Sequence, residues 1–182
     1  SCMVAPRRLR TSPASPEQPD PSTAARSSYG ALTVSGQAST PVAEVDVVGV
    51  GNAIVDVISQ ATDGFVGDQG LAKGSMTLID EDRAHSLYDL MGPGIDASGG
   101  SAANTMAGVA SFGGSANYIG KVSADALGEV FAHDIRATGV EFAVPAATQG
   151  PATARCLILV TPDAQRTMST FLGISSLLEP DD

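Results

Sequence analysis

The chain has 182 residues and a formal net charge of −10. Six basic and seventeen acidic side chains fall in residues 45–182, which argues against a nucleic-acid partner, because an acidic surface repels polyanions. No run of eighteen apolar residues occurs, so we expect no membrane span. The two cysteines, Cys2 and Cys156, fit neither a disulfide framework nor a metal-ligand spacing, and this favours the cytoplasm.

Residues 1–44 are rich in Ser, Pro, Ala and Thr and contain no periodic apolar segment, which predicts a disordered tail or linker. Arg7, Arg8 and Arg10 would fit an organelle transit peptide. Glu17, Asp20 and the many prolines disfavour the amphipathic helix that such a peptide needs. Transit peptide, linker and wrongly translated upstream sequence all stay open.

The run "VDVVGV" from Val45 predicts a strand buried on both faces. Gly49 and Gly51 follow, but a dinucleotide fingerprint needs a third glycine that opens a helix, and Ile54 stands there at the start of a strand-forming run. We expect instead that Asn52 and Asp56 project into the crevice at the strand's carboxyl end, where a carboxylate can accept hydrogen bonds from paired ligand hydroxyls. The alternative is a turn-forming Asn52 and an exposed Asp56.

Two amphipathic helices are predicted further along the chain. In "LIDEDRAHSLYDLMGPG", Asp80 is the expected N-cap and Gly92 the stop, with Leu87, Leu90 and Met91 on the buried side. In "SADALGEVFAHDIRATGV", Ser123 or Asp125 is the expected cap. The second apolar stripe consists of Leu127, Val130, Phe131 and Ile135, and Gly139 ends the helix.

Strands are expected in "ANYIGKV", in "GSMTLI" (residues 74–79), and in the hairpin "TARCLILVTPDAQRTMSTFLG", whose turn is "TPDAQ". Alternating strands and helices predict an α/β fold with a mainly parallel sheet. The segment at residues 74–79 and the hairpin predict a small additional antiparallel layer.

The stretch "SGGSAANTMAGVASFGG", residues 98–114, predicts a helix of small residues that begins after Gly99 and Gly100 and contains Asn104. The first N–H groups of such a helix have no intrahelical partner, so they would face an incoming polar ligand.

Together with "GVGNAIVD", "GGSAANT", "IGKVSADALGEVF" and "DAQRTMSTFLG", the sequence resembles the PfkB-type carbohydrate kinase family, which includes ribokinase and adenosine kinase. The resemblance runs from about Val45 to the end of the chain. It implies a ribokinase-like fold, with a partial parallel sheet, flanking helices and a small antiparallel β lid. The N-x-x-x-D spacing of Asn52 and Asp56 is more similar to adenosine kinase and bacterial sugar kinases than to ribokinase.

The resemblance also implies roles for individual residues. Asp56 and Asn104 would hydrogen-bond the hydroxyls of a ribose or sugar, and Asn52 would assist at the same ring. Gly99, Gly100 and Ser101 would contact the substrate and form the lid hinge. Arg166 would be the lid arginine near the transferring phosphate, although an exposed hairpin arginine is the alternative.

The family's catalytic aspartate lies in a D-T-x-G-A-G-D motif that these 182 residues do not contain. We therefore expect residues 45–182 to be the N-terminal part of a nucleoside or sugar kinase, inactive alone, with the sites for ATP and Mg²⁺ mostly elsewhere and no metal ligands of its own. The expected state is a monomer or a lid-mediated homodimer. A non-catalytic nucleoside- or sugar-binding protein, or a dimerisation protein, is the alternative.

Overall fold

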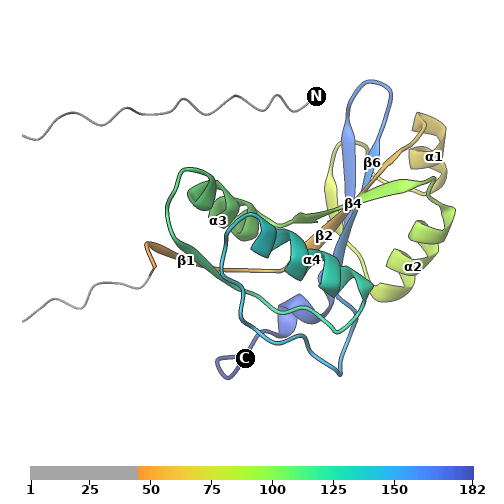
Figure 1. The fold of residues 1–182 in the computed structure, drawn as a ribbon. Helices are drawn as coiled ribbons and strands as arrows, with labels where there is room; N and C mark the ends of the chain where they lie inside the picture. Colours follow the sequence, from red (N-terminus) through yellow and green to blue (C-terminus); the bar gives the residue numbers. More distant parts are fainter. Residues whose placement is uncertain (1–44) are drawn as a thin grey trace, which may run out of the picture. The chain divides into compact units, whose positions relative to one another are not determined.

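The computed structural model describes residues 45–182, so the interpretations of residues 1–44 lie outside the described part. The elements are β1 Val47–Val50, β2 Ile54–Gln60, α1 Asp63–Asp68, β3 Met76–Leu78, α2 Glu81–Leu90, β4 Gly94–Gly99, α3 Ser101–Ser111, β5 Ala116–Ile119, α4 Ala126–Ala137, β6 Ala154–Val160, β7 Arg166–Phe171 and the 3-10 helix η1 Gly173–Leu177 (Figure 1).

The strands of residues 45–182 form two sheets. β1 and β5 pair in parallel, and a single parallel bridge joins Asn117 to Glu141 beyond β5. The second sheet has five strands in the order β3-β7-β6-β2-β4, with antiparallel pairs β2–β4 and β6–β7 and parallel pairs β2–β6 and β3–β7. The expected α/β class, with a partial parallel sheet and a small β layer, is confirmed.

Two expectations about the strands are wrong. β1 is not buried on both faces, because α3 packs against the Gly49 side, whereas Val48 and Val50 project to the other side and are exposed. β3 pairs with β7 in parallel rather than antiparallel. β4 and the short helix α1 are not among the elements that the sequence predicts.

Both amphipathic helices begin at the predicted acidic caps. The Asp80 side chain accepts a hydrogen bond from the Arg83 N–H at the start of α2, and the Asp125 side chain accepts one from the Gly128 N–H at the start of α4. Leu87 is fully buried on α2, but Leu90 is 56% exposed, contrary to prediction, since the sheet lies only under the Leu87 side of the helix.

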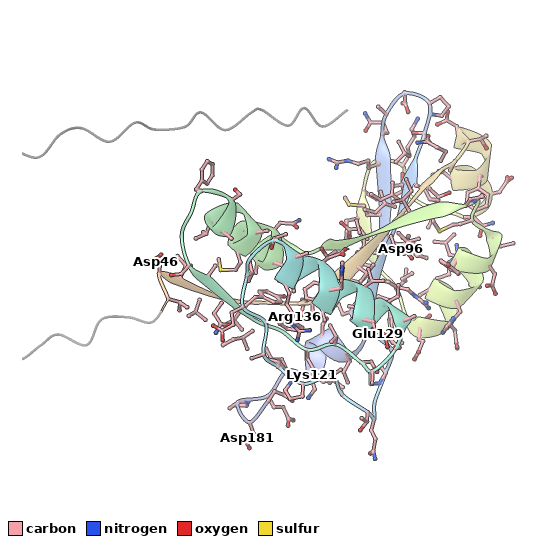
Figure 2. All side chains as sticks on the ribbon, in the orientation of Figure 1. Asp46, Asp96, Lys121, Glu129, Arg136 and Asp181 are labelled. Carbon is pink, nitrogen blue, oxygen red and sulfur yellow. The ribbon has the colours of Figure 1, made fainter. Side chains whose placement is uncertain are left out.

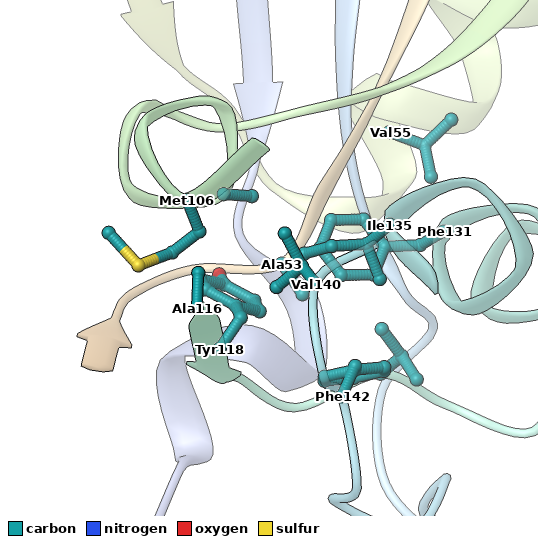
Figure 3. Close-up of a cluster of buried hydrophobic side chains, with 11 residues drawn as sticks. Ala53, Val55, Met106, Ala116, Tyr118, Phe131, Ile135, Val140 and Phe142 are labelled. Carbon is teal, nitrogen blue, oxygen red and sulfur yellow. The ribbon is translucent and has the colours of Figure 1, made fainter. Parts of the chain in front are cut away.

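The core between α3, α4 and the parallel pair is built on aromatic side chains. The rings of Tyr118, Phe131 and Phe142 lie 5.6–5.9 Å apart, and Met106 packs beside them (Figure 3). A Cβ atom on Gly49 would lie 2.7 Å from Met106 Cγ, so the glycine lets α3 approach β1 closely. This packing brings the start of α3 beside the β1–β2 loop.

Helices cover one face of the five-stranded sheet. Val57 and Leu157 pack against Leu87 of α2, and Val55 belongs to the cluster that contains Phe131 of α4. α1 and α2 lie on the same side of the strands (Figure 1). None of the helices in residues 45–182 is long and apolar enough to cross a membrane.

Candidate functional site

The face of the five-stranded sheet opposite α2 and α4 carries Asp56, and we call it the Asp56 face. Strand register sets its rows, because residues paired between neighbouring strands project to the same side. One row runs across all five strands and consists of Ala97, Asp56, Cys156, Thr170 and Leu78. With strands about 4.8 Å apart, Leu78 lies roughly 14 Å from Asp56.

Asp56 is half-buried on β2, and burial raises the pKa of its carboxyl above the ordinary value. No side chain or backbone N–H of residues 45–182 donates a hydrogen bond to this carboxylate. A carboxylate that is partly removed from water and lacks a donor is unfavourable on its own, so it is available to accept hydrogen bonds from a ligand.

Gly99 and Gly100 let the junction between β4 and α3 pass close to the start of β2. A Cβ atom on Gly99 would lie 2.6 Å from Asp56 Cγ and 2.9 Å from Oδ1. Gly100 has φ +93°, and a Cβ there would lie 2.8 Å from the Asn52 carbonyl oxygen. Only glycine fits both positions, and their packing places the β4–α3 junction against Asn52 and Asp56.

Asn104 lies in the first turn of α3, where its N–H donates to the Gly100 carbonyl oxygen over 2.9 Å. Gly100 is the N-cap and forms no side-chain capping bond, so the first N–H groups of α3 face outward unpaired within the helix. The side chains of Ser101, Asn104 and Asn52 are exposed. The structure thus gathers six of the seven predicted residues around one strand–helix junction.

Arg166, the seventh, lies apart. It starts β7 on the Asp56 face, four residues before Thr170, which is roughly 13 Å along the strand. It is exposed beside the hairpin turn, in which Asp163 forms a 2.8 Å ion pair with Lys73. The Lys73 ammonium lowers the pKa of Asp163 to about 2.

A cavity of about 400 Å³ opens near the Leu78 end of the Asp56 row. Its walls are mostly apolar and consist of Leu78, Ile79, Pro151, Thr170, Phe171, Leu172, Gly173, Ser176 and Leu177. Cys156 separates Asp56 from Thr170, and the Thr170 hydroxyl donates to Cys156 Sγ over 3.2 Å. The sequence analysis missed Leu78, Cys156 and Thr170. Their alternation along strands was visible, but which strands pair with β2 was not.

The described residues do not form a Mg²⁺ site. Residues 45–182 contain no group of three or more His, Cys, Asp or Glu side chains close enough to hold a metal ion. Of the charged side chains labelled in Figure 2, Asp96 lies on β4, whereas Glu129 and Arg136 lie on α4. No chemical step through ATP or Mg²⁺ can therefore be derived from these residues.

Comparison with known proteins places this arrangement among kinases. Residues 96–182 match the pfkB family of carbohydrate kinases. The adenosine kinase of Sinorhizobium meliloti shares 54% identity with a TM-score of 0.72, and a probable sugar kinase protein of Rhizobium etli CFN 42 shares 52% with a TM-score of 0.71. The first match covers 77% of this chain and 43% of that one, and the second covers 76% and 42%.

A more distant structure shows the same fold. The adenosine kinase of Schistosoma mansoni in complex with adenosine has a TM-score of 0.65 at 24% identity, covering 74% of this chain and 40% of that one. Among curated proteins there is no match. The expected resemblance to PfkB-type kinases and the ribokinase-like fold are thereby confirmed.

Proposed function

Because residues 96–182 belong to the pfkB family of carbohydrate kinases, we propose that this chain supplies the acceptor-binding part of an ATP-dependent phosphotransferase. The acceptor is a nucleoside or sugar with a hydroxymethyl group, and adenosine is the first choice. The single observation that carries this proposal is the half-buried Asp56 carboxylate, which has no donor within residues 45–182 and packs against Gly99.

The chemistry of the junction suits a polyol. The Asp56 carboxylate can accept hydrogen bonds from two adjacent hydroxyls of one ring. Asn104, which can both donate and accept, lies one helical turn from Gly100, and the Asn52 carbonyl oxygen lies beside Gly100. The acceptor's ring would therefore occupy the space between β2 and the start of α3.

The apolar cavity favours a nucleoside over a simple sugar. It adjoins Leu78 and Thr170, at the far end of the row that begins near Asp56. A flat, largely apolar base fits a cavity lined by aliphatic and aromatic side chains, while the attached ribose extends back toward the carboxylate. A free sugar would leave this cavity without a ligand group.

The acceptor-binding part is expected not to transfer phosphate by itself. Phosphoryl transfer needs a group that orients the hydroxyl and cations that neutralise the phosphates. On the Asp56 face, residues 45–182 form no cluster of acidic side chains that could hold a metal ion. Arg166 is an exposed cation at the hairpin end of that face. We propose that Arg166 approaches the phosphate only after the sheet moves toward the rest of the kinase.

Calorimetry with the 182-residue chain tests the proposal. We expect binding of adenosine, weaker binding of ribose, and an Asp56→Asn variant that binds adenosine about 30-fold more weakly, which corresponds to roughly 2 kcal/mol for a charge-assisted hydrogen-bond pair. The matched control is Asp96→Asn, on the neighbouring strand β4 but paired with Val57 on the opposite face. Equal adenosine affinity in the wild type and in Asp56→Asn would refute the role of Asp56.

A second candidate, dimerisation through the Asp56 face, is favoured by the exposure of Ile95 (72%) and Met76 (55%) on that face. Sedimentation equilibrium on the same samples separates the two functions. A dimer that adenosine leaves intact, in a protein that shows no heat of binding, would support the second candidate.

A further inference from the structure

The next row on the Asp56 face is entirely apolar. It lies one pair of residues nearer the hairpin turn and consists of Ile95, Ile58, Ile158, Met168 and Met76, paired in register across all five strands. Met76 is directly opposite Met168 and is 55% exposed, and Met168 is half-buried. Two thioethers therefore lie side by side at the edge of this face.

These methionines lie next to the groups of the proposed acceptor site. Met168 is two residues from Thr170 on β7, and Met76 is two residues from Leu78 on β3, on the same face in both cases. Two residues along a strand span about 7 Å, which is within the reach of a methionine side chain. Leu78 and Thr170 line the apolar cavity, so the two methionines lie one row of residues away from its wall.

Exposure separates Met76 from the other sulfurs in residues 45–182, whereas Met168 differs from Met91, which is also half-buried, in the face of the sheet on which it lies. Met106 is 4% exposed and packs against Gly49, and Met91 packs with Val57 on the helix-covered face. Cys156 is 6% exposed, and burial raises the pKa of its thiol, so little reactive thiolate forms. A thioether needs no ionisation to react with a peroxide, which leaves access as the deciding factor.

We propose that Met76 and Met168 form a peroxide-sensitive modification site whose oxidation to methionine sulfoxide weakens acceptor binding. In each step a sulfur lone pair attacks one oxygen of hydrogen peroxide, an S–O bond forms, the O–O bond breaks and water leaves. The sulfur is oxidised by two electrons and the peroxide is reduced by two. The effect on binding rests on the proposed function, whereas the selectivity of oxidation does not.

The consequence for binding follows from polarity. A sulfoxide is polar and strongly hydrated, so an apolar acceptor group beside it must displace water that the thioether does not hold. We expect adenosine affinity to fall roughly tenfold when both methionines are oxidised. Because methionine sulfoxide reductases reverse the reaction, the site would respond to the redox state of its surroundings.

The experiment treats the 182-residue chain, carrying Cys2→Ser, with graded hydrogen peroxide and maps each methionine by peptide mass spectrometry. Adenosine affinity is measured by calorimetry before and after treatment. The variants are Met76→Leu with Met168→Leu, which nearly conserves volume, and Met91→Leu as the matched control. Each protein is compared with itself before oxidation, so any change caused by the substitution cancels.

We expect Met76 to oxidise first and Met168 before Met106. The wild type and Met91→Leu should lose about tenfold in affinity, and the double variant should keep its starting affinity. Oxidation of Met106 or Met91 as fast as Met76, full affinity with both sulfoxides present, or an equal loss in the double variant would each overturn the proposal. If the untreated protein binds no adenosine, the proposed function and the binding effect fail together, and the oxidation map still decides the selectivity.

Discussion

Asp56 is held in a half-buried position for which the described fold provides no hydrogen-bond donor. Its neighbours explain the placement: Gly99 leaves room for the carboxylate, and register puts Asp56 between Ala97 and Cys156, neither of which can neutralise it. A residue selected for stability alone would be apolar here, like Ile54 and Ile58 on the same face. Function offers a reason for the charge, since catalytic and binding groups commonly sit in such unfavourable surroundings.

This placement predicts how the stability of the chain depends on pH. Burial raises the folded-state pKa of Asp56, so the native state binds this proton more tightly than the unfolded chain, and stability falls as pH rises from the ordinary carboxyl range through the raised value. Asp56→Asn removes that effect. We expect the variant to be more stable at pH 7, by less than about 1 kcal/mol because the group is half exposed, and the gain to disappear below about pH 4.

Urea unfolding at pH 7 and pH 3.5 measures the difference, and Asp96→Asn controls for the loss of one exposed charge from the acidic chain. The same Asp56→Asn sample should bind adenosine poorly, so stability and binding would change in opposite directions. A variant that is less stable than the wild type at pH 7 would mean that Asp56 has a structural partner.

At the scale of elements, the connection between α4 and β6 is stronger than an ordinary helix cap. Asp125 accepts hydrogen bonds from the Gly128 N–H (2.8 Å), the Thr153 hydroxyl (2.7 Å) and the Thr153 N–H (2.9 Å). Thr153 is fully buried just before β6 and also accepts from the Ser123 N–H. Asp125 therefore fixes where the chain enters the five-stranded sheet.

Alanine at the two acidic caps should separate capping from this connection. Asp80→Ala removes one exposed cap bond from α2 and should cost about 1 kcal/mol of unfolding free energy. Asp125→Ala also leaves the buried Thr153 groups unpaired, and we expect a cost of about 2–4 kcal/mol. Urea unfolding of both variants measures the difference, and equal costs would show that Thr153 finds other partners.

Local sequence signals predict individual helix starts and turns well, but they do not predict which strands pair with one another. Asp80 is predicted as a cap, and Asp125 as one of two candidates with Ser123, because the chemistry of a helix start lies within four residues. The hairpin turn is predicted for the same reason, and in the structure the Thr161 N–H donates a hydrogen bond to the Gln165 carbonyl oxygen across that turn. The parallel direction of β3 and the existence of β4 depend on partners far away in the sequence, β7 and β2, which no local pattern specifies.

The same difference between local motifs and strand pairing applies to the residues of the candidate site. Two short motifs contain the predicted site residues of this junction, and the fold packs Gly99 against Asp56 and Gly100 against the Asn52 carbonyl oxygen. Strand register places Cys156, Thr170 and Leu78 in one row with Asp56, and neither composition nor residue spacing predicts that register. Leu90 and the exposed valines of β1 were assigned to the core because an apolar stripe does not reveal how many neighbours cover it.

At the scale of the whole molecule, charge and surface agree with an acceptor-binding part. The chain carries a net charge of −10, which does not oppose an uncharged nucleoside or sugar but does oppose the phosphates of ATP. Val48 and Val50 of β1 are 51% and 61% exposed, on a strand whose only strand partner within residues 45–182 is β5.

A crystal structure of the 182-residue chain with adenosine tests the central claim most directly, because it locates the acceptor without relying on a substitution. We predict ribose hydroxyls within about 3.2 Å of the Asp56 carboxylate and of the Asn104 side chain, with the base toward the cavity beside Leu78 and Thr170. Adenosine bound on the helix-covered face, or on the Asp56 face with Asp56 turned away from it, would contradict the claim.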